Sequence, residues 1–177
     1  MPQRMDERQL RIEPWTKGDL NVLCRNTAPD MMIHLGGPET DEQVVARHSR
    51  YLALNERDTG QMFRIVLLPE NLVVLGIEVW DSEWRDEAVY EIGWSVIPEF
   101  QGRGIATVAI GLLIAHARSE RRHRSLHAFP SIANAASNAV CRKAGFTLIG
   151  SHDEAYPPGS TTWMRMNEWR LGLTAAD

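Results

Sequence analysis

The sequence predicts a single α+β domain, in which a mixed, mostly antiparallel sheet of about six to seven strands is flanked by about four helices. Three observations lead to this prediction. The 177 residues suffice for one domain of ordinary size. Strand-like and helix-like segments are interspersed along the chain rather than separated into two halves. Three strand-like segments follow one another directly, as they do in antiparallel hairpins.

The first quarter of the chain predicts one strand and two helices. Alternating apolar residues over 10–15 indicate the strand, and Thr16 is expected to cap a helix that ends before Pro29. Residues 40–43, Thr-Asp-Glu-Gln, form a capping box, and apolar residues follow them at helical spacing. The second helix therefore has the clearer start.

The next segment predicts an antiparallel meander. Strands are expected over residues 62–68, 72–80 and 88–97. Residues 69–71, Pro-Glu-Asn, have turn chemistry, and the polar residues 81–87 are expected to form a connection. Pro98 ends the third strand, because proline cannot donate to a ladder.

The second half of the chain predicts the remaining helices and strands. We expect a long helix over 104–119, a short strand over 125–129, a helix over 134–144 and two closing strands over 146–149 and 163–171. Gly145 follows the shorter helix at the position that needs a left-handed residue.

The overall composition limits the partners of the protein. Its 44% hydrophobic and 24% charged residues are typical of a soluble globular domain, and a net charge of −4 argues against binding of nucleic acid. Cys24 and Cys141 are too few for a disulfide framework, and no zinc-site spacing is present, so we expect no metal. With no bilayer-length apolar run and no apolar signal core, we expect a cytoplasmic protein without a membrane partner.

A glycine-rich turn joins the third strand of the meander to the long helix. Its residues, 96–107, are Val-Ile-Pro-Glu-Phe-Gln-Gly-Arg-Gly-Ile-Ala-Thr. Such a turn can direct several backbone N–H groups at one point, next to the positive end of the helix dipole. Small residues at Gly102, Gly104 and Ala106 leave room for an anion to approach the backbone. The segment therefore predicts a pyrophosphate-binding loop.

Three known phosphate-binding loops can be compared with this turn. A Walker loop is excluded because no Gly-Lys-Ser/Thr follows. A dinucleotide fingerprint would need Gly or Ala at Thr107 and a parallel βαβ unit. The third pattern, the acetyl-CoA loop Gln/Arg-x-x-Gly-x-Gly/Ala, matches residues 101–106 at every fixed position.

A second motif follows at the shorter helix. Asn134-Ala-Ala-Ser137 and Lys143-Ala-Gly-Phe146 resemble the Asn-x-x-Ser … Lys-x-Gly-Phe helix of the GNAT superfamily of N-acetyltransferases. Within that family the sequence resembles the branch of ribosomal-protein N-terminal (serine/alanine) acetyltransferases. The resemblance spans about residues 10–171 and implies that residues 1–177 are a single N-acetyltransferase domain.

This resemblance implies where acetyl-CoA binds. In the family, acyl-CoA lies in a cleft where two neighbouring parallel strands splay apart, here the strands expected over 88–97 and 125–129. The cofactor-binding residues that the resemblance assigns are Trp94, Ser95 and Val96 for the pantetheine arm, Gln101, Gly102, Arg103, Gly104, Ile105, Ala106 and Thr107 for the pyrophosphate, and Asn134 and Ser137 beside the arm. Ser137 also fits a surface hydroxyl of the helix.

The reaction of such an enzyme needs a group that removes a proton from the acceptor ammonium. Glu91 is our candidate general base, because it lies in an otherwise apolar strand where desolvation should raise its pKa. A structural ion pair or backbone contact is the alternative role for this residue. Glu78 is the second choice, and His127 is the third.

The departing CoA thiolate also takes up a proton. Many relatives use a tyrosine seven residues after the motif asparagine, but this sequence has Cys141 there. A thiol could serve, because its pKa of about 8.5 is similar to that of the leaving group. Cys141 also fits as an apolar residue of the helix. Tyr156 and water are the other candidates.

The sequence therefore predicts an acetyl-CoA-dependent N-acetyltransferase that acts on a primary amine, either a protein N-terminus or a small molecule, in a ternary complex. A non-catalytic acyl-CoA-binding sensor or regulatory module is the alternative. Residues 33–40, which contain two glycines, are expected to line the acceptor site. The oligomeric state, monomer or homodimer, stays open.

Overall fold

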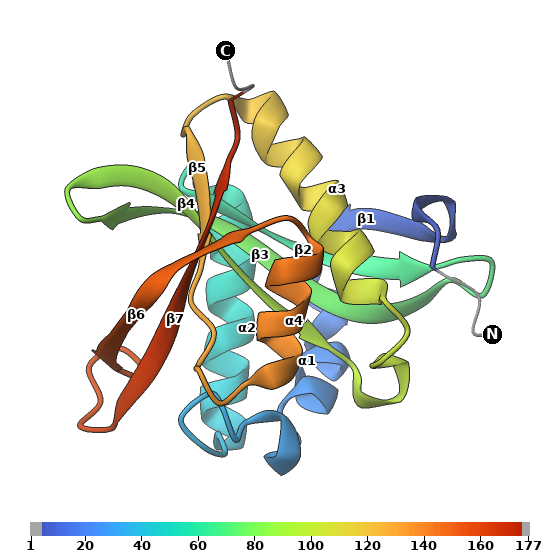
Figure 1. Ribbon diagram of the computed structural model, residues 1–177. Coiled ribbons are helices and arrows are strands. Elements are labelled where there is room, and N and C mark those ends of the chain that lie inside the picture. Colours follow the sequence, from blue (N-terminus) through green and yellow to red (C-terminus); the bar gives the residue numbers. More distant parts are fainter. Residues whose placement is uncertain (1–4, 175–177) are drawn as a thin grey trace.

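The computed structural model describes residues 5–174, and in it one seven-stranded sheet runs through the molecule in the order β1-β2-β3-β4-β5-β7-β6 (Figure 1). The strands are β1 Leu10–Pro14, β2 Gly60–Leu67, β3 Leu72–Trp84, β4 Glu87–Val96, β5 Ser125–Ala128, β6 Thr147–Ala155 and β7 Trp163–Gly172. Only β4 and β5 pair in parallel. The α+β class and the mostly antiparallel sheet are confirmed.

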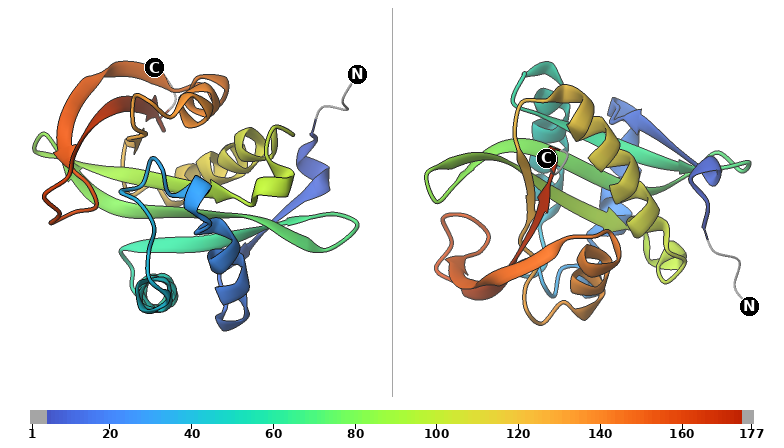
Figure 2. Two further views of the ribbon diagram at one scale, coloured as in Figure 1. Left: turned by 90° about the horizontal axis from the view of Figure 1, so that it is seen from below. Right: turned by 45° about the horizontal axis from the view of Figure 1, so that its top comes forward.

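Four α-helices cover the sheet on two sides. They are α1 Leu20–Asn26, α2 Asp41–Glu56, α3 Ile105–Glu120 and α4 Ala135–Lys143. Figure 2 shows α1 and α2 on one face and α3 on the other. The apolar stripe of α3 forms the main core with the strands, and a smaller core lies beneath α1 and α2.

Local sequence signals set the ends of the helices. At the start of α2, Gln43 N–H donates to Thr40 Oγ1 at 3.3 Å and Thr40 N–H donates to Gln43 Oε1 at 2.8 Å, as the capping box predicts. Gly145 follows α4 with φ of +91°, the left-handed conformation expected there.

The connection expected over residues 81–87 is wrong, because β3 continues to Trp84. Only Arg85 and Asp86 form the turn, both with positive φ, and Ser82 pairs with Val89 on β4. The hairpin projects beyond the covering helices (Figure 1), so its residues remain partly solvated and their polarity is compatible with a strand. Likewise β6 extends well beyond residue 149, where the sequence suggested its end.

The two parallel strands diverge soon after they meet. Their register contains only Tyr90↔Leu126 and Glu91↔His127. Beyond that point β4 stays with β3, where Ile97 N–H donates to the Val74 carbonyl at 3.0 Å. The chain after β5 follows β7 instead, since Asn167 N–H donates to the Pro130 carbonyl at 2.8 Å. The predicted splayed pair is present, with its apex at Glu91.

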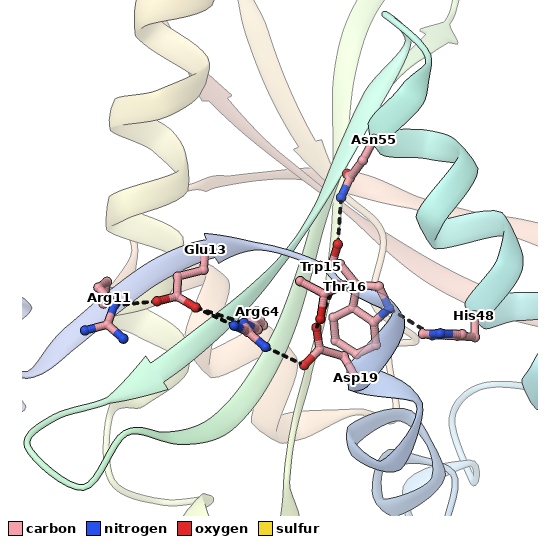
Figure 3. Close-up of polar contacts among 8 residues, drawn as sticks. All are labelled: Arg11, Glu13, Trp15, Thr16, Asp19, His48, Asn55 and Arg64. Carbon is pink, nitrogen blue, oxygen red and sulfur yellow. Dashed lines mark hydrogen bonds and ion pairs between the residues drawn. The ribbon is translucent and has the colours of Figure 1, made fainter.

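A polar network fastens the helices of one face to the sheet (Figure 3). Asp19, ahead of α1, accepts hydrogen bonds from the backbone and hydroxyl of Thr16 and from Arg64 on β2. Trp15 Nε1 donates to His48 Nδ1 on α2 at 3.0 Å. The bond from Trp15 ties α2 to the residue that follows β1, and residues of α2 border the candidate acceptor site described below.

Candidate active site

The predicted pyrophosphate loop presents an uninterrupted run of backbone donors. The N–H groups of residues 102–107 have no hydrogen-bond acceptor within residues 5–174, whereas the flanking N–H groups of Gln101 and Val108 donate to Pro98 and Gly104. Three of the free donors belong to the first turn of α3, where an α-helix has no internal acceptors. An anion at this point would satisfy the donors and the helix dipole together.

The glycines of the loop are required by its backbone conformation. Gly102 and Gly104 have φ of +72° and +79°, the left-handed region in which side chains are strained. Apart from the two chain neighbours, no atom of residues 5–174 lies within 4 Å of a Cβ built on Gly102, so the space above this residue is open to a ligand. The loop therefore fits the pyrophosphate group expected from the sequence.

The loop is tied to the end of β4 by Gln101. Its side-chain amide donates to the Val96 carbonyl at 3.2 Å, so the expected phosphate and pantetheine segments adjoin. Since Ile97 N–H points to β3, alternation along the strand directs the backbone groups of Val96 and Trp94 into the splay. The backbone of Ser95 points to β3, and its carbonyl also accepts Asn26 Nδ2 at 3.3 Å.

Other residues that the resemblance assigned to the cofactor lie at the start of α4 and in the loop before α3. Asn134 caps α4, with its Oδ1 accepting the N–H of Ser137 at 3.0 Å, so these two residues are brought together by the cap. The guanidinium of Arg103 lies over the ring of Phe100. The basic turn after α3 is at the far end of this helix, about 24 Å from the loop, and Arg122 there pairs with Asp58 and Asp81.

Glu91 lies at the apex of the splay, half-buried on the face that α1 and α2 cover. Burial raises the pKa of its carboxyl group to about 7, and the negative charges of Glu154 and Glu78 act in the same direction. The hydroxyl of Ser82 donates to Glu91 Oε2 at 3.0 Å and opposes the shift. A carboxylate with this pKa can accept a proton at neutral pH.

Glu78, the second choice, lies on the same face of the sheet as Glu91. It pairs with Gly93, two residues from Glu91, and burial raises its pKa. The hydroxyl of Tyr51 on α2 lies 3.5 Å from Glu78 Oε1. Tyr156 lies close enough to both carboxyl groups for their charges to add to the burial that raises its pKa.

His127 and Cys141 are less accessible than the sequence alone could indicate. His127 is buried on β5, and burial lowers its pKa. The Cys141 side chain is 0% exposed within the main core, and burial raises the pKa of its thiol to about 12. A thiol in that environment holds its proton at neutral pH, which fits packing better than proton donation.

Two groups of residues in the site were missed by the sequence analysis. Ser82 was assigned to a connection, so its contact with Glu91 was not anticipated. Arg47 and Arg50 of α2 carried no motif, although both charges act on Glu78. Within residues 5–174, no three His, Cys, Asp or Glu side chains are grouped so that they could hold a metal, and none of the helices there has the length and apolarity to cross a bilayer.

A splayed parallel pair beside a helix start with free N–H donors is the arrangement that the sequence resemblance assigns to acyl-CoA binding. The chain matches the model of the acetyltransferase (GNAT) domain over residues 9–147 and belongs to that family. It is therefore an acetyl-CoA-dependent N-acetyltransferase, as the resemblance of its two motifs implied.

Individual relatives are distant. An uncharacterized N-acetyltransferase of Bacillus subtilis, YnaD, is 26% identical over 72% of this chain and 71% of its own. The Salmonella typhimurium acetyltransferase that modifies the N-terminal serine of ribosomal protein L7/L12 has a similar structure, with a TM-score of 0.77 and 20% identity over 93% and 95% of the two chains. The structure of spermidine N-acetyltransferase of Vibrio cholerae, in complex with CoA and spermine, is also similar. Its TM-score is 0.75, and its sequence is 14% identical over 94% of this chain and 96% of that chain.

Proposed function

We propose that this enzyme transfers the acetyl group of acetyl-CoA directly to a primary amine in a ternary complex, with Glu91 as the general base. The observation that carries this proposal is the position of the carboxyl group at the apex of the splayed strands, with a pKa of about 7. One domain performs the reaction, since all seven strands belong to one sheet.

In this proposal different residues along the cleft bind different parts of acetyl-CoA. The N–H groups of residues 102–107 hold the pyrophosphate, together with the flanking Gln101 that orders the loop. The pantetheine arm pairs with the backbone of Trp94 and Val96, where β5 has turned away. Asn134 and Ser137 stand at the start of α4 on the other wall of the opening.

The chemical step moves two protons and one acyl group. Glu91 takes one proton from the acceptor ammonium, directly or through water. The neutral nitrogen attacks the thioester carbonyl carbon, the C–N bond forms and the C–S bond breaks. The CoA thiolate takes up the second nitrogen-bound proton through water, since Cys141 is enclosed in the core. The scheme uses neither a metal nor a nucleic acid.

The acceptor is a protein N-terminus or a small-molecule amine, and names among the similar structures support both. The test is release of CoA thiol with a panel of primary amines. Wild type should turn over at least one of them, and Glu91→Gln should lower kcat about 10²-fold while acetyl-CoA still binds. An undiminished kcat in the variant would remove Glu91 from the mechanism.

A further inference from the structure

An open cavity of about 470 Å³ lies beside α2, next to the loop that the sequence assigned to the acceptor site. Its walls include Gly36 and Glu39 from the loop ahead of α2, Arg47 and Arg50 from the helix, and Pro157. Pro157 closes one side, because it lies within 3.3 Å of the position that a Cβ on Gly36 would occupy. The loop that the sequence assigned to the acceptor site thus borders this cavity.

The charge of the cavity wall is dominated by two arginines. Arg47 and Arg50 are three residues apart and share one side of α2. Glu39 forms an ion pair with Arg47, but the Nε of this arginine is buried without a hydrogen-bond partner in the part of the chain from 5 to 174. Arg50 forms no ion pair with any described residue and lies over the ring of Tyr51. The guanidinium of Arg50 is therefore available to an anion, and Arg47 beside it keeps one buried N–H without a partner in the described part of the chain.

The same wall adjoins the reacting end of the site. Tyr51, next to Arg50, reaches Glu78, which lies opposite Gly93 on the face that carries Glu91. Pro157 follows Tyr156 directly in the chain. The charges of Glu78 and Glu91 add to the burial that raises the pKa of Tyr156, so this tyrosine lies near both carboxyl groups. The acceptor side thus has carboxylates around its proposed base and guanidinium groups at its outer wall.

We propose that the acceptor carries an anionic group, a carboxylate, beside its reacting amine, and that Arg50 together with Arg47 binds this group in the cavity. This inference rests on the proposed function and narrows its acceptor. A carboxylate matches the planar donor fork of arginine, which can bind it through two parallel hydrogen bonds. An acceptor with only ammonium groups would bring a second positive charge toward the two arginines.

The carboxylate has two possible sources, which matched acceptors distinguish. Alanine against alaninamide tests a free amino acid. The amidated tripeptides Ala-Glu-Ala and Ala-Gln-Ala test the side chain of a peptide N-terminus, and 1,4-diaminobutane serves as the purely cationic acceptor. In one pair or the other, wild type should favour the carboxylate member in kcat/KM by roughly tenfold to a hundredfold.

The variant Arg50→Gln should abolish this preference by raising KM for the carboxylate acceptor, while KM for acetyl-CoA stays unchanged. Arg50→Lys should retain part of the preference, because it keeps the charge but loses the fork. Arg118→Gln is the matched control, since Arg118 is exposed on α3 across the sheet, and its preference should equal that of wild type.

Equal use of both members of each pair, a preference that survives in Arg50→Gln, or faster turnover of the diamine would overturn the inference while leaving the proposed function standing. Failure of every amine as acceptor, with acetyl-CoA still bound, would instead refute the proposed function, and the inference would fall with it. The two failures are therefore distinguishable in one set of assays.

Discussion

At the scale of single residues, two opposed local effects set the pKa of Glu91, the proposed general base. Burial raises its pKa to about 7, and the hydrogen bond from Ser82 Oγ stabilises the ionised form and lowers it. Because the base acts when ionised, kcat/KM should rise about tenfold per pH unit below this pKa and level off above it. Ser82→Ala removes the hydrogen bond, so the rising limb should move to higher pH.

The measurement is kcat/KM between about pH 5 and pH 9 for both proteins. Ser119→Ala, an exposed hydroxyl on α3, is the control and should reproduce the wild-type profile. Superimposable profiles for wild type and Ser82→Ala would show that this contact does not tune the base.

The same physical effect has opposite consequences at Cys141. Burial raises the pKa of both side chains, because a charged form is poorly solvated in the core. For the carboxyl group of Glu91 the shift brings the pKa close to neutral pH, which makes the carboxylate a stronger base. For a thiol it leads to about 12, so the group neither ionises nor donates near pH 7. The residue types alone therefore did not show which of the two candidates, Glu91 or Cys141, has a pKa near neutral pH.

At the scale of elements, the start of α3 combines a left-handed glycine with free donors. Gly104→Ala places a side chain on a residue whose φ is +79°, where an alanine is strained by about 1 kcal/mol. The turn should relax away from this conformation, so its N–H groups would no longer point at one place. We expect the Kd for acetyl-CoA, measured by calorimetry, to rise at least roughly tenfold.

The matched control for this variant lies in the helix that follows Gly104. Gly111 is in the interior of α3, and apart from the helix's own backbone no atom of residues 5–174 lies within 4 Å of a Cβ built on it. Gly111→Ala should therefore leave acetyl-CoA affinity unchanged and raise stability by up to about 1 kcal/mol, because alanine is the better helix former. Equal affinity in both alanine variants would mean that the loop conformation is not needed for binding.

Elements whose signals are local were predicted well from the sequence. The capping box at Thr40, the glycine after α4 and the glycine-rich turn before α3 each depend on a few neighbouring residues. The end of β3 was missed because the polar residues 81–83 are strand residues only through pairing with β4. Local polarity cannot reveal a partner strand that follows later in the chain.

The same distinction applies to the site. The acetyl-CoA loop and Glu91 could be proposed from the sequence because a motif and an apolar strand mark them. The contact of Ser82 with Glu91 and the closeness of Arg50 to Glu78 depend on register and on the packing of α2 over the sheet. Such relations join residues distant in sequence, and a single sequence without a matching motif carries no signal for them.

At the scale of the whole molecule, the splay leaves the two parts of the sheet joined by a short parallel pairing. Side chains near the β3–β4 turn add a second connection. The Trp84 ring packs at a tilt of 50° against Phe129 and His152 from the other part, and Arg85 forms an ion pair of 2.8 Å with Glu168 on β7. Contacts at the closed end thus hold the strands together, while the other end is open where we propose that acetyl-CoA binds.

The ion pair at this closed end should matter more than its exposed arginine suggests. Glu168 is only 3% exposed, and its Oε2 lies 2.8 Å from the Arg85 guanidinium, so Arg85→Ala leaves a buried carboxylate without this countercharge. We expect a loss of about 1–3 kcal/mol in urea unfolding, partly recovered in the double variant with Glu168→Gln. Arg165→Ala breaks the exposed pair with Asp153 on the same part of the sheet and should change stability by less than about 1 kcal/mol. Equal effects of the two arginine variants would show that the closed end is held by the aromatic contacts instead.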